Sequence, residues 1–184
     1  MEGIDILMEE HRIIERVLSA LEKQAQRLQA GSAVRLGFFQ DASAFARNFA
    51  DGCHHRKEEE SFFMALVDSG LSNQTGPIAI MLAEHEQGRA YNREMEKATR
   101  AIARGDLSAK DDLTRNALDY VTLLRQHIRR ENEFLFPLAA RMIPAPRQKE
   151  LAGEFERIER EETGAGIHEK YHRLAEAMEK EAEG

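Results

Sequence analysis

The stretch CHHRKEEESFF, Cys53 to Phe63, decides how this chain folds. Two histidines, two further cations and three glutamates run directly into a pair of phenylalanines. On a helix, residues four apart stack on one face about 6 Å apart along the axis, so a histidine and a glutamate at that spacing point at the same place. If the stretch is one helix, some of its ionisable groups therefore turn toward the protein interior.

Length and composition indicate one folded domain. The chain has 184 residues, of which 42% are hydrophobic and 32% charged. A formal charge of −7, without a clustered Lys/Arg stripe, argues against a nucleic-acid or anionic-membrane partner. No apolar run approaches the roughly 18 residues of a membrane span, and the amino terminus is acidic, so we expect a cytoplasmic protein. Cys53 is the only cysteine, which excludes an intrachain disulfide.

The hydrophobic pattern predicts an all-α protein. Apolar residues recur at steps of three and four, without a convincing alternating run. Long helices are expected at about 3–30, 34–69 and 77–104, and a fourth from a cap at Asp106 or Ser108 to the IPAP segment at 143–146. Four long helices joined by short loops favour an up-down-up-down antiparallel four-helix bundle. Residues 1–143 would form this bundle, and 144–184 would form a C-terminal helical extension packed on it.

The chain contains an internal repeat. ILMEEH, Ile6 to His11, resembles IMLAEH, Ile80 to His85, and HHRKEEESFF, His54 to Phe63, resembles HIRRENEFLF, His127 to Phe136. Each half is thus a helical hairpin with one histidine on its first helix and His-x-x-x-Glu on its second.

Three of these histidines, His11, His85 and His127, fall on the apolar stripes of their helices. A single buried histidine is usually a hydrogen-bonded core residue. A set of four histidines and two carboxylates is different, because burial without partners would cost several kcal/mol per charged group. A pair of dications would supply those partners, so the repeat predicts a dinuclear metal site.

The second helix fits the motif in two registers, His54 with Glu58 and His55 with Glu59. The phenylalanine stripe does not decide between them, and Gly52 is a point at which the helical phase can reset. The repeat favours the first register, because aligning the two phenylalanine pairs superimposes His54 on the histidine of the second half. We therefore expect His55, Glu59 and Glu60 at the helix surface or behind the ligands. The predicted metal ligands are His11, His54, Glu58, His85, His127 and Glu131.

Imidazoles and carboxylates without a thiolate suit first-row metals such as iron, manganese or zinc. Two histidines per metal, with both carboxylates bridging, leave both ions short of octahedral coordination. The open positions would accept water, hydroxide, dioxygen, peroxide or nitric oxide.

At these residues the sequence resembles the hemerythrin-like family with the HHE (His-His-Glu) cation-binding domain. The pattern EEH … HHRKEEESFF … EHEQGR … HIRRENEFLFP extends the resemblance from residue 1 to about 143. The resemblance implies a four-helix bundle around a non-haem di-iron centre, bridged by an oxo or hydroxo group and by carboxylates. It assigns His11 and His54 to one iron, His85 and His127 to the other, and Glu58 and Glu131 to the bridging positions.

Two departures separate the chain from the oxygen-carrying hemerythrins. Arg89 stands where those proteins have a second histidine on the third helix, and the last motif is His-x-x-x-Glu where theirs is His-x₄-Asp. One iron is therefore expected to lack a nitrogen ligand, and Arg89 is expected to point to solvent. Both features argue against reversible dioxygen carriage and favour the bacterial branches, whose proposed roles include sensing or handling oxygen, peroxide and nitric oxide, and repair of iron centres.

The carboxy-terminal segment offers further donors: Glu159, Glu161, Glu162, His168, Tyr171 and His172. One of them would supply the missing ligand if the segment folds over the end of the bundle. We instead expect Ile167, Tyr171 and Leu174 to pack against the bundle while the acidic residues face water.

The leading functional hypothesis is a di-iron protein that binds or reacts with a small oxidant such as dioxygen, peroxide or nitric oxide. One alternative is a di-iron redox enzyme that reduces peroxide or nitric oxide or repairs iron centres. Another is a metal-free structural helical bundle.

Overall fold

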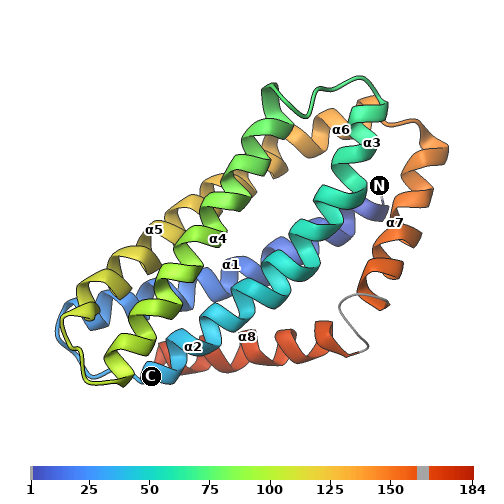
Figure 1. Ribbon diagram of the computed structural model, residues 1–184. Coiled ribbons are helices and arrows are strands. Elements are labelled where there is room, and N and C mark those ends of the chain that lie inside the picture. Colours follow the sequence, from blue (N-terminus) through green and yellow to red (C-terminus); the bar gives the residue numbers. More distant parts are fainter. Residues whose placement is uncertain (1, 161–165) are drawn as a thin grey trace.

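A computed structural model describes residues 2–160 and 166–184. All the secondary structure in these ranges is helical, which confirms the predicted fold class. Figure 1 shows long helical rods lying side by side, with two further helices along one flank. None of the described helices is both long enough and apolar enough to cross a membrane.

The four predicted long helices are present as four rods. The first and third are single helices, α1 (Glu2–Gln29) and α4 (Gly76–Ala103). The second comprises α2 (Leu36–Phe45), η1 (Ala46–His55), η2 (Glu58–Phe62) and α3 (Phe63–Asp68), where η marks a π-helix. The fourth comprises α5 (Ala109–Arg130), η3 (Glu131–Leu135) and α6 (Phe136–Met142). The rods agree with the predicted ranges to within a residue or two at each end.

The residues that end the rods act as the sequence suggests. Gly31 follows α1 with φ +78°, a left-handed conformation that glycine adopts without a steric penalty. Gly70 does the same after α3, with φ +104°. Pro77 lies in the first turn of α4, where its missing N–H leaves no hydrogen bond unmade.

The apolar core consists of two clusters at different levels along the rods. One contains Leu18, Phe45, Met95 and Leu124, and the other contains Leu7, Phe62, Met81 and Leu135. On each rod the predicted ligand residues fall between these two levels. The ionisable groups therefore lie in the middle of the bundle, with apolar side chains above and below them.

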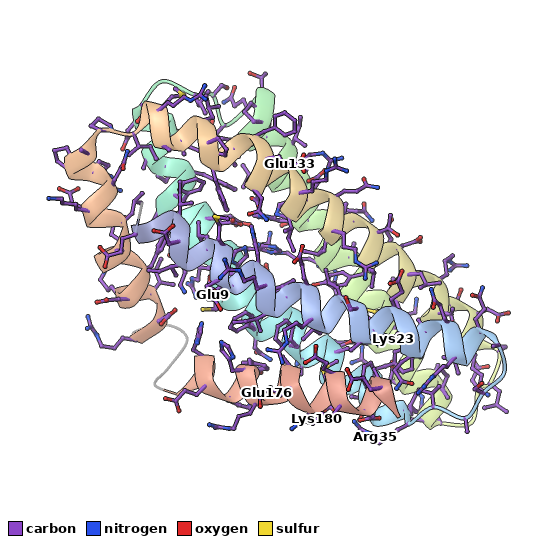
Figure 2. All side chains as sticks on the ribbon, turned by 180° about the vertical axis from the view of Figure 1, so that it is seen from behind. Glu9, Lys23, Arg35, Glu133, Glu176 and Lys180 are labelled. Atoms are coloured by element: carbon purple, nitrogen blue, oxygen red, sulfur yellow. The ribbon has the colours of Figure 1, made fainter. Side chains whose placement is uncertain are left out.

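The C-terminal helices α7 (Ala145–Ile158) and α8 (Ile167–Glu183) lie against the rods. α7 contacts α1 and η2, and α8 contacts α1, α2 and η1. Tyr171 of α8 is buried, with its ring centroid 5.9 Å from that of Phe45, and Leu174 packs partly buried beside the same cluster. Figure 2 shows α8 running along α1 toward Arg35, whose guanidinium Nη2 lies 2.7 Å from Oε2 of Glu181. Glu161, Glu162 and the side chain of Ile167 lie outside the described residues.

Candidate metal centre

The six predicted ligand residues meet in the interior of the bundle. They come from all four rods, and each exposes at most 1% of its surface: His11 (α1), His54 (η1), Glu58 (η2), His85 (α4), His127 (α5) and Glu131 (η3). Their donor atoms fall into two adjacent groups.

The first group contains His11, His54, Glu58 and Glu131, whose ligand atoms all lie within 4.8 Å of one another. Nε2 of His11 is 3.2 Å from Oε2 of Glu131. Nε2 of His54 is 3.5 Å from Oε1 of Glu58. Two imidazole nitrogens and two carboxylates thus converge on one point, as a first-row metal ion requires.

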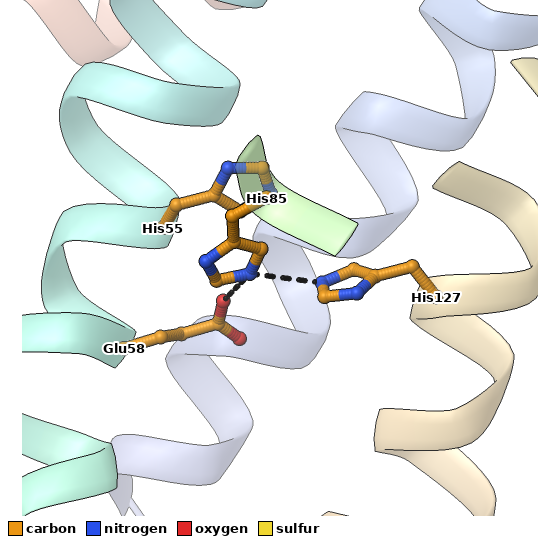
Figure 3. A group of neighbouring side chains, drawn as sticks. All are labelled: His55, Glu58, His85 and His127. Carbon is orange, nitrogen blue, oxygen red and sulfur yellow. Dashed lines mark hydrogen bonds and ion pairs between the residues drawn. The ribbon is translucent and has the colours of Figure 1, made fainter. Parts of the chain in front are cut away.

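The second group contains His55, Glu58, His85 and His127, again within 4.8 Å of one another. Figure 3 shows the carboxylate of Glu58 and the ring of His127 both directed at the same nitrogen of His85. Nε2 of His85 is 3.3 Å from Oε2 of Glu58 and 3.1 Å from Nε2 of His127. The ring of His55 stacks on that of His85, with centroids 3.8 Å apart.

The placement of His55 corrects the sequence prediction. We expected it at the helix surface or behind the ligands, whereas it is 4% exposed and belongs to the second group. The cause is the π-helix: the N–H of Arg56 donates to the carbonyl of Asp51, five residues back, so the turn is wider than an α-helical one. Both His54 and His55 can then face inward, and Gly52 lies inside the distorted segment.

The two carboxylates stand between the groups. Glu58 directs one oxygen toward His54 and the other toward His85. Oε2 of Glu131 is 3.2 Å from Nε2 of both His11 and His127. Each carboxylate therefore reaches nitrogen donors on both sides, which is the arrangement that bridging between two ions needs.

Four histidines are oriented by partners at their outer nitrogen, Nδ1. The Nδ1 contacts are 2.9 Å from His54 to Glu10, 2.7 Å from His85 to Glu59, 3.0 Å from His127 to Glu84 and 3.0 Å from His11 to Asn132. With Nδ1 protonated and donating outward, Nε2 carries its lone pair toward the centre. This is the tautomer that a metal-ligating histidine uses.

Most of the ligand atoms that face the centre lack hydrogen-bond partners; the exceptions are Nε2 of His85 and Nε2 of His127, which lie 3.1 Å from each other. Within the described residues, Nε2 of His11 and of His54, both nitrogens of His55 and all four oxygens of Glu58 and Glu131 are buried without one. Buried polar groups are almost always paired, because leaving one unpaired costs about 1–3 kcal/mol. A group of unpaired donor atoms around one point fits a pair of cations, whereas a purely structural core would satisfy or avoid these groups.

The carboxylates influence each other's protonation. Burial raises the pKa of Glu58 well above its ordinary value, and the charge of Glu131 raises it further. Burial acts on Glu131 in the same direction, but the adjacent imidazoles of His127 and His11 outweigh it and lower the pKa of Glu131. Without a metal ion, one carboxyl of the pair keeps its proton.

The buried histidines also have shifted pKa values, and the shifts differ in direction. It lowers the pKa of His54 and His85 well below the ordinary value and that of His55 to about 3, with neighbouring imidazoles adding to the effect. Burial acts on His127 too, but Glu131 and Glu84 reverse the outcome and raise its pKa to about 9. Most of the set is therefore neutral, as ligation requires, and metal binding would expel the proton of His127.

Arg89 does not point to solvent as expected. Its side chain is 24% exposed, and its guanidinium lies 2.7 Å from each of three carboxylates, those of Asp51, Glu59 and Glu86. His55, from a different helix, places an additional nitrogen at this side of the centre.

The C-terminal extension comes close to the centre without entering either group. Glu159 contacts the ammonium of Lys57, which is fully buried and also contacts Glu10, the partner of His54. His168 lies 3.8 Å from the same Glu10 carboxylate. Glu159 and His168 belong to neither of the two groups that share Glu58. Together with Glu10 they form a third set of ligand atoms within 4.8 Å of one another, behind His54.

A buried set of imidazoles and carboxylates inside a helical bundle defines a metal-binding helical protein. The family model of the hemerythrin HHE cation binding domain matches residues 2–139. The chain therefore belongs to the hemerythrin HHE cation-binding family, as the sequence resemblance predicted.

Curated relatives are found in mycobacteria. Uncharacterized protein Rv1995 of Mycobacterium tuberculosis H37Rv and Uncharacterized protein Mb2018 of Mycobacterium bovis are each 26% identical to this chain over 171 residues. The matched region is 92% of this chain but 66% of each relative, so the chain spans less than two thirds of their length. No solved structure matches the chain significantly.

Proposed function

We propose that this chain holds two iron ions in a non-haem centre that binds or reacts with a small oxidant. His11 and His54 would hold one ion, His55, His85 and His127 the other, and Glu58 and Glu131 would bridge them. The observation that carries the proposal is the set of buried donor atoms without hydrogen-bond partners. The resemblance to the family favours iron, and the same donors also suit manganese or zinc.

The assignment of His55 changes where a ligand is expected to bind. The first ion would have two histidine nitrogens and the second would have three, so the first has fewer protein donors. A bound iron pair supplies redox chemistry and open coordination positions, and we expect dioxygen, peroxide or nitric oxide to bind on the His11 and His54 side. The outer partners hold the imidazoles still, and the two apolar clusters exclude bulk water.

We also propose that the four rods and the C-terminal helices have the arrangement expected from the sequence. The short connections between rods favour the up-down-up-down antiparallel order, with residues 1–143 as the metal-binding bundle and 144–184 as its helical extension. The family match, which ends at residue 139, supports this division.

Elemental analysis of protein purified without added metal tests the metal assignment. We expect close to two irons per chain and near-ultraviolet absorption from bridged ferric ions. Two manganese ions would refute iron while keeping the dinuclear site. No metal, or one zinc ion, would refute the dinuclear site itself.

The reaction with a small ligand is tested separately. Anaerobically reduced, iron-loaded protein should pass to the diferric form in air, because the less completely ligated ion is open to oxidation. The visible spectrum should show no long-lived oxygen adduct through cycles of air and vacuum. A coloured adduct that persists and is reversed by removing oxygen would restore the oxygen-carrier interpretation.

A further inference from the structure

The guanidinium of Arg89 forms hydrogen bonds from three different nitrogens. Nε donates to Oδ1 of Asp51, Nη2 to Oε1 of Glu59 and Nη1 to Oε1 of Glu86, each at 2.7 Å. The planar fork of arginine suits such a set of carboxylates, since it offers several donors in a fixed geometry. All three branches of the side chain are thus committed to acids on η1, on η2 and on its own helix.

Two of these carboxylates stand behind histidines of the second metal group. Oε1 of Glu59, the atom that accepts from Arg89, is also 2.7 Å from Nδ1 of His85. Oδ1 of Asp51, which accepts from Nε of Arg89, lies 3.6 Å from Nδ1 of His55. Arg89 and His85 therefore share one carboxylate, that of Glu59, by hydrogen bonds. Asp51 brings a second carboxylate held by Arg89 near His55, but not within hydrogen-bond distance.

Solvent lies immediately beside this arrangement. A cavity of about 240 Å³ is lined by Asp51, His55 and Arg89, together with Asn92 and Arg93 of the same helix α4. The side chains of Asp51 and Glu59 are 29% and 28% exposed. Without a cation to hold them, both carboxylates could turn toward water, and the outer nitrogen of His85 would lose its partner Glu59.

We propose that Arg89 is a positioning residue for the second metal position, where it orients His85 by fixing Glu59. This inference rests on the proposed metal-binding function. Removing an outer partner of a metal-ligating histidine typically weakens metal affinity by about 10- to 100-fold. The first position has different outer partners, Glu10 and Asn132, so it should be affected far less.

The test is a cobalt(II) titration of the metal-free protein, followed by visible absorption, which resolves the two positions as successive binding steps. Arg89→Gln should weaken one step by about 10- to 100-fold, change the absorption of that step, and leave the other within about threefold. Arg89→Lys should fall between wild type and Arg89→Gln, because an ammonium cannot serve carboxylates in the geometry of the fork.

Three further variants separate positioning from general stability. Arg93→Gln removes an exposed arginine one turn further along the helix, which lines the same cavity and forms no ion pair within the described ranges, and it should behave as wild type. Glu86→Gln removes the one partner of Arg89 that stands behind no histidine of the groups, and it should do the same. Glu59→Gln should weaken the same step as Arg89→Gln, and the double variant should be weaker by less than the product of the two effects.

Each remaining outcome contradicts the proposal. If Arg89→Gln weakens both steps equally, leaves both unchanged, or combines with Glu59→Gln in a fully additive way, Arg89 does not position the second site. If wild-type protein takes up no cobalt, or one ion, the dinuclear assignment itself fails. The two failures are therefore distinguishable in one set of titrations.

Discussion

Lys57 offers a quantitative test of how the first metal position is supported. Its side chain is fully buried, and its ammonium contacts the carboxylates of Glu10 and Glu159. Burial opposes the charged form, but the charge of Glu10 and the hydrogen bonds to both carboxylates outweigh it, so the pKa of Lys57 lies above its ordinary value. Glu10 is 1% exposed and in turn accepts from Nδ1 of His54.

Lys57→Met would remove the ammonium and keep a side chain of similar length. Glu159 can turn to water because it is 35% exposed, whereas Glu10 cannot. Breaking a buried ion pair by removing one partner typically costs 3–5 kcal/mol, so we expect the metal-free protein to lose about 3 kcal/mol of unfolding free energy. Without the ammonium, Glu10 is no longer held against His54, so metal affinity at the first position should fall about tenfold.

The double variant Lys57→Met/Glu10→Gln sharpens the test. The glutamine oxygen can still accept from His54, and no charge is left buried. The double variant should therefore be within about 1 kcal/mol of wild type, which makes it about 2 kcal/mol more stable than Lys57→Met alone. Denaturant unfolding of metal-free protein, followed by circular dichroism, measures these differences, and the exposed Lys149→Met is the matched control. A loss below about 1 kcal/mol for Lys57→Met, or a double variant as unstable as the single one, would refute this reasoning.

Three further predictions concern the centre itself. His55→Ala should retain about half the iron of the wild type by elemental analysis. His172→Ala, which belongs to no candidate metal group of the described residues, should retain all of it, and full retention by His55→Ala would remove His55 from the ligand set. Gly52→Ala would place a methyl group 3.1 Å from the carbonyl oxygen of Arg47, so it should lower the unfolding free energy by about 1 kcal/mol and reduce metal content. Metal-free protein should be most stable near pH 6.5, the approximate pKa of histidine in the unfolded chain. Below that pH, His55 takes up a proton in the unfolded chain but not in the folded protein, where its pKa is about 3, so stability falls as the pH is lowered. Above that pH, His127 keeps its proton in the folded protein, where its pKa is about 9, but loses it in the unfolded chain, so stability falls as the pH is raised. Metal loading should abolish the loss of stability above pH 6.5. Denaturant midpoints of metal-free protein that rise steadily from pH 6 to 9 would contradict this prediction.

Most of the fold could be predicted because local and global signals agree. The steps of three and four place apolar residues on one face of each rod, and glycine or proline stands at the ends of the rods. The repeat also identified six residues that the structure brings together, and their role as ligands stays a prediction. These signals depend on α-helical periodicity, so they are reliable where the rods are α-helical.

The errors arose where that periodicity is interrupted. Aligning the two halves assumes that both second helices have the same geometry, and Ile128 stands in the second half where His55 stands in the first. Two adjacent histidines beside Gly52 were the available signal that both face inward, but they do not reveal a π-helix. Arg89 was misplaced for a related reason: its partners Asp51 and Glu59 lie on η1 and η2, whose orientation depends on the same distortion.

The π-helix of residues 46–55 also bears on how such centres change during evolution. A π-helical turn holds one residue more than the α-helical turn it replaces, while the flanking helix keeps its phase. A single-codon insertion in an ancestral α-helix could therefore have added an inward-facing histidine without disturbing Phe45 on one side or Phe62 on the other. By the same reasoning, a one-residue deletion here would remove a donor and leave the bundle intact. Relatives that differ by one residue in this segment would then differ in the nitrogen count of one metal ion, even where every other ligand position is the same.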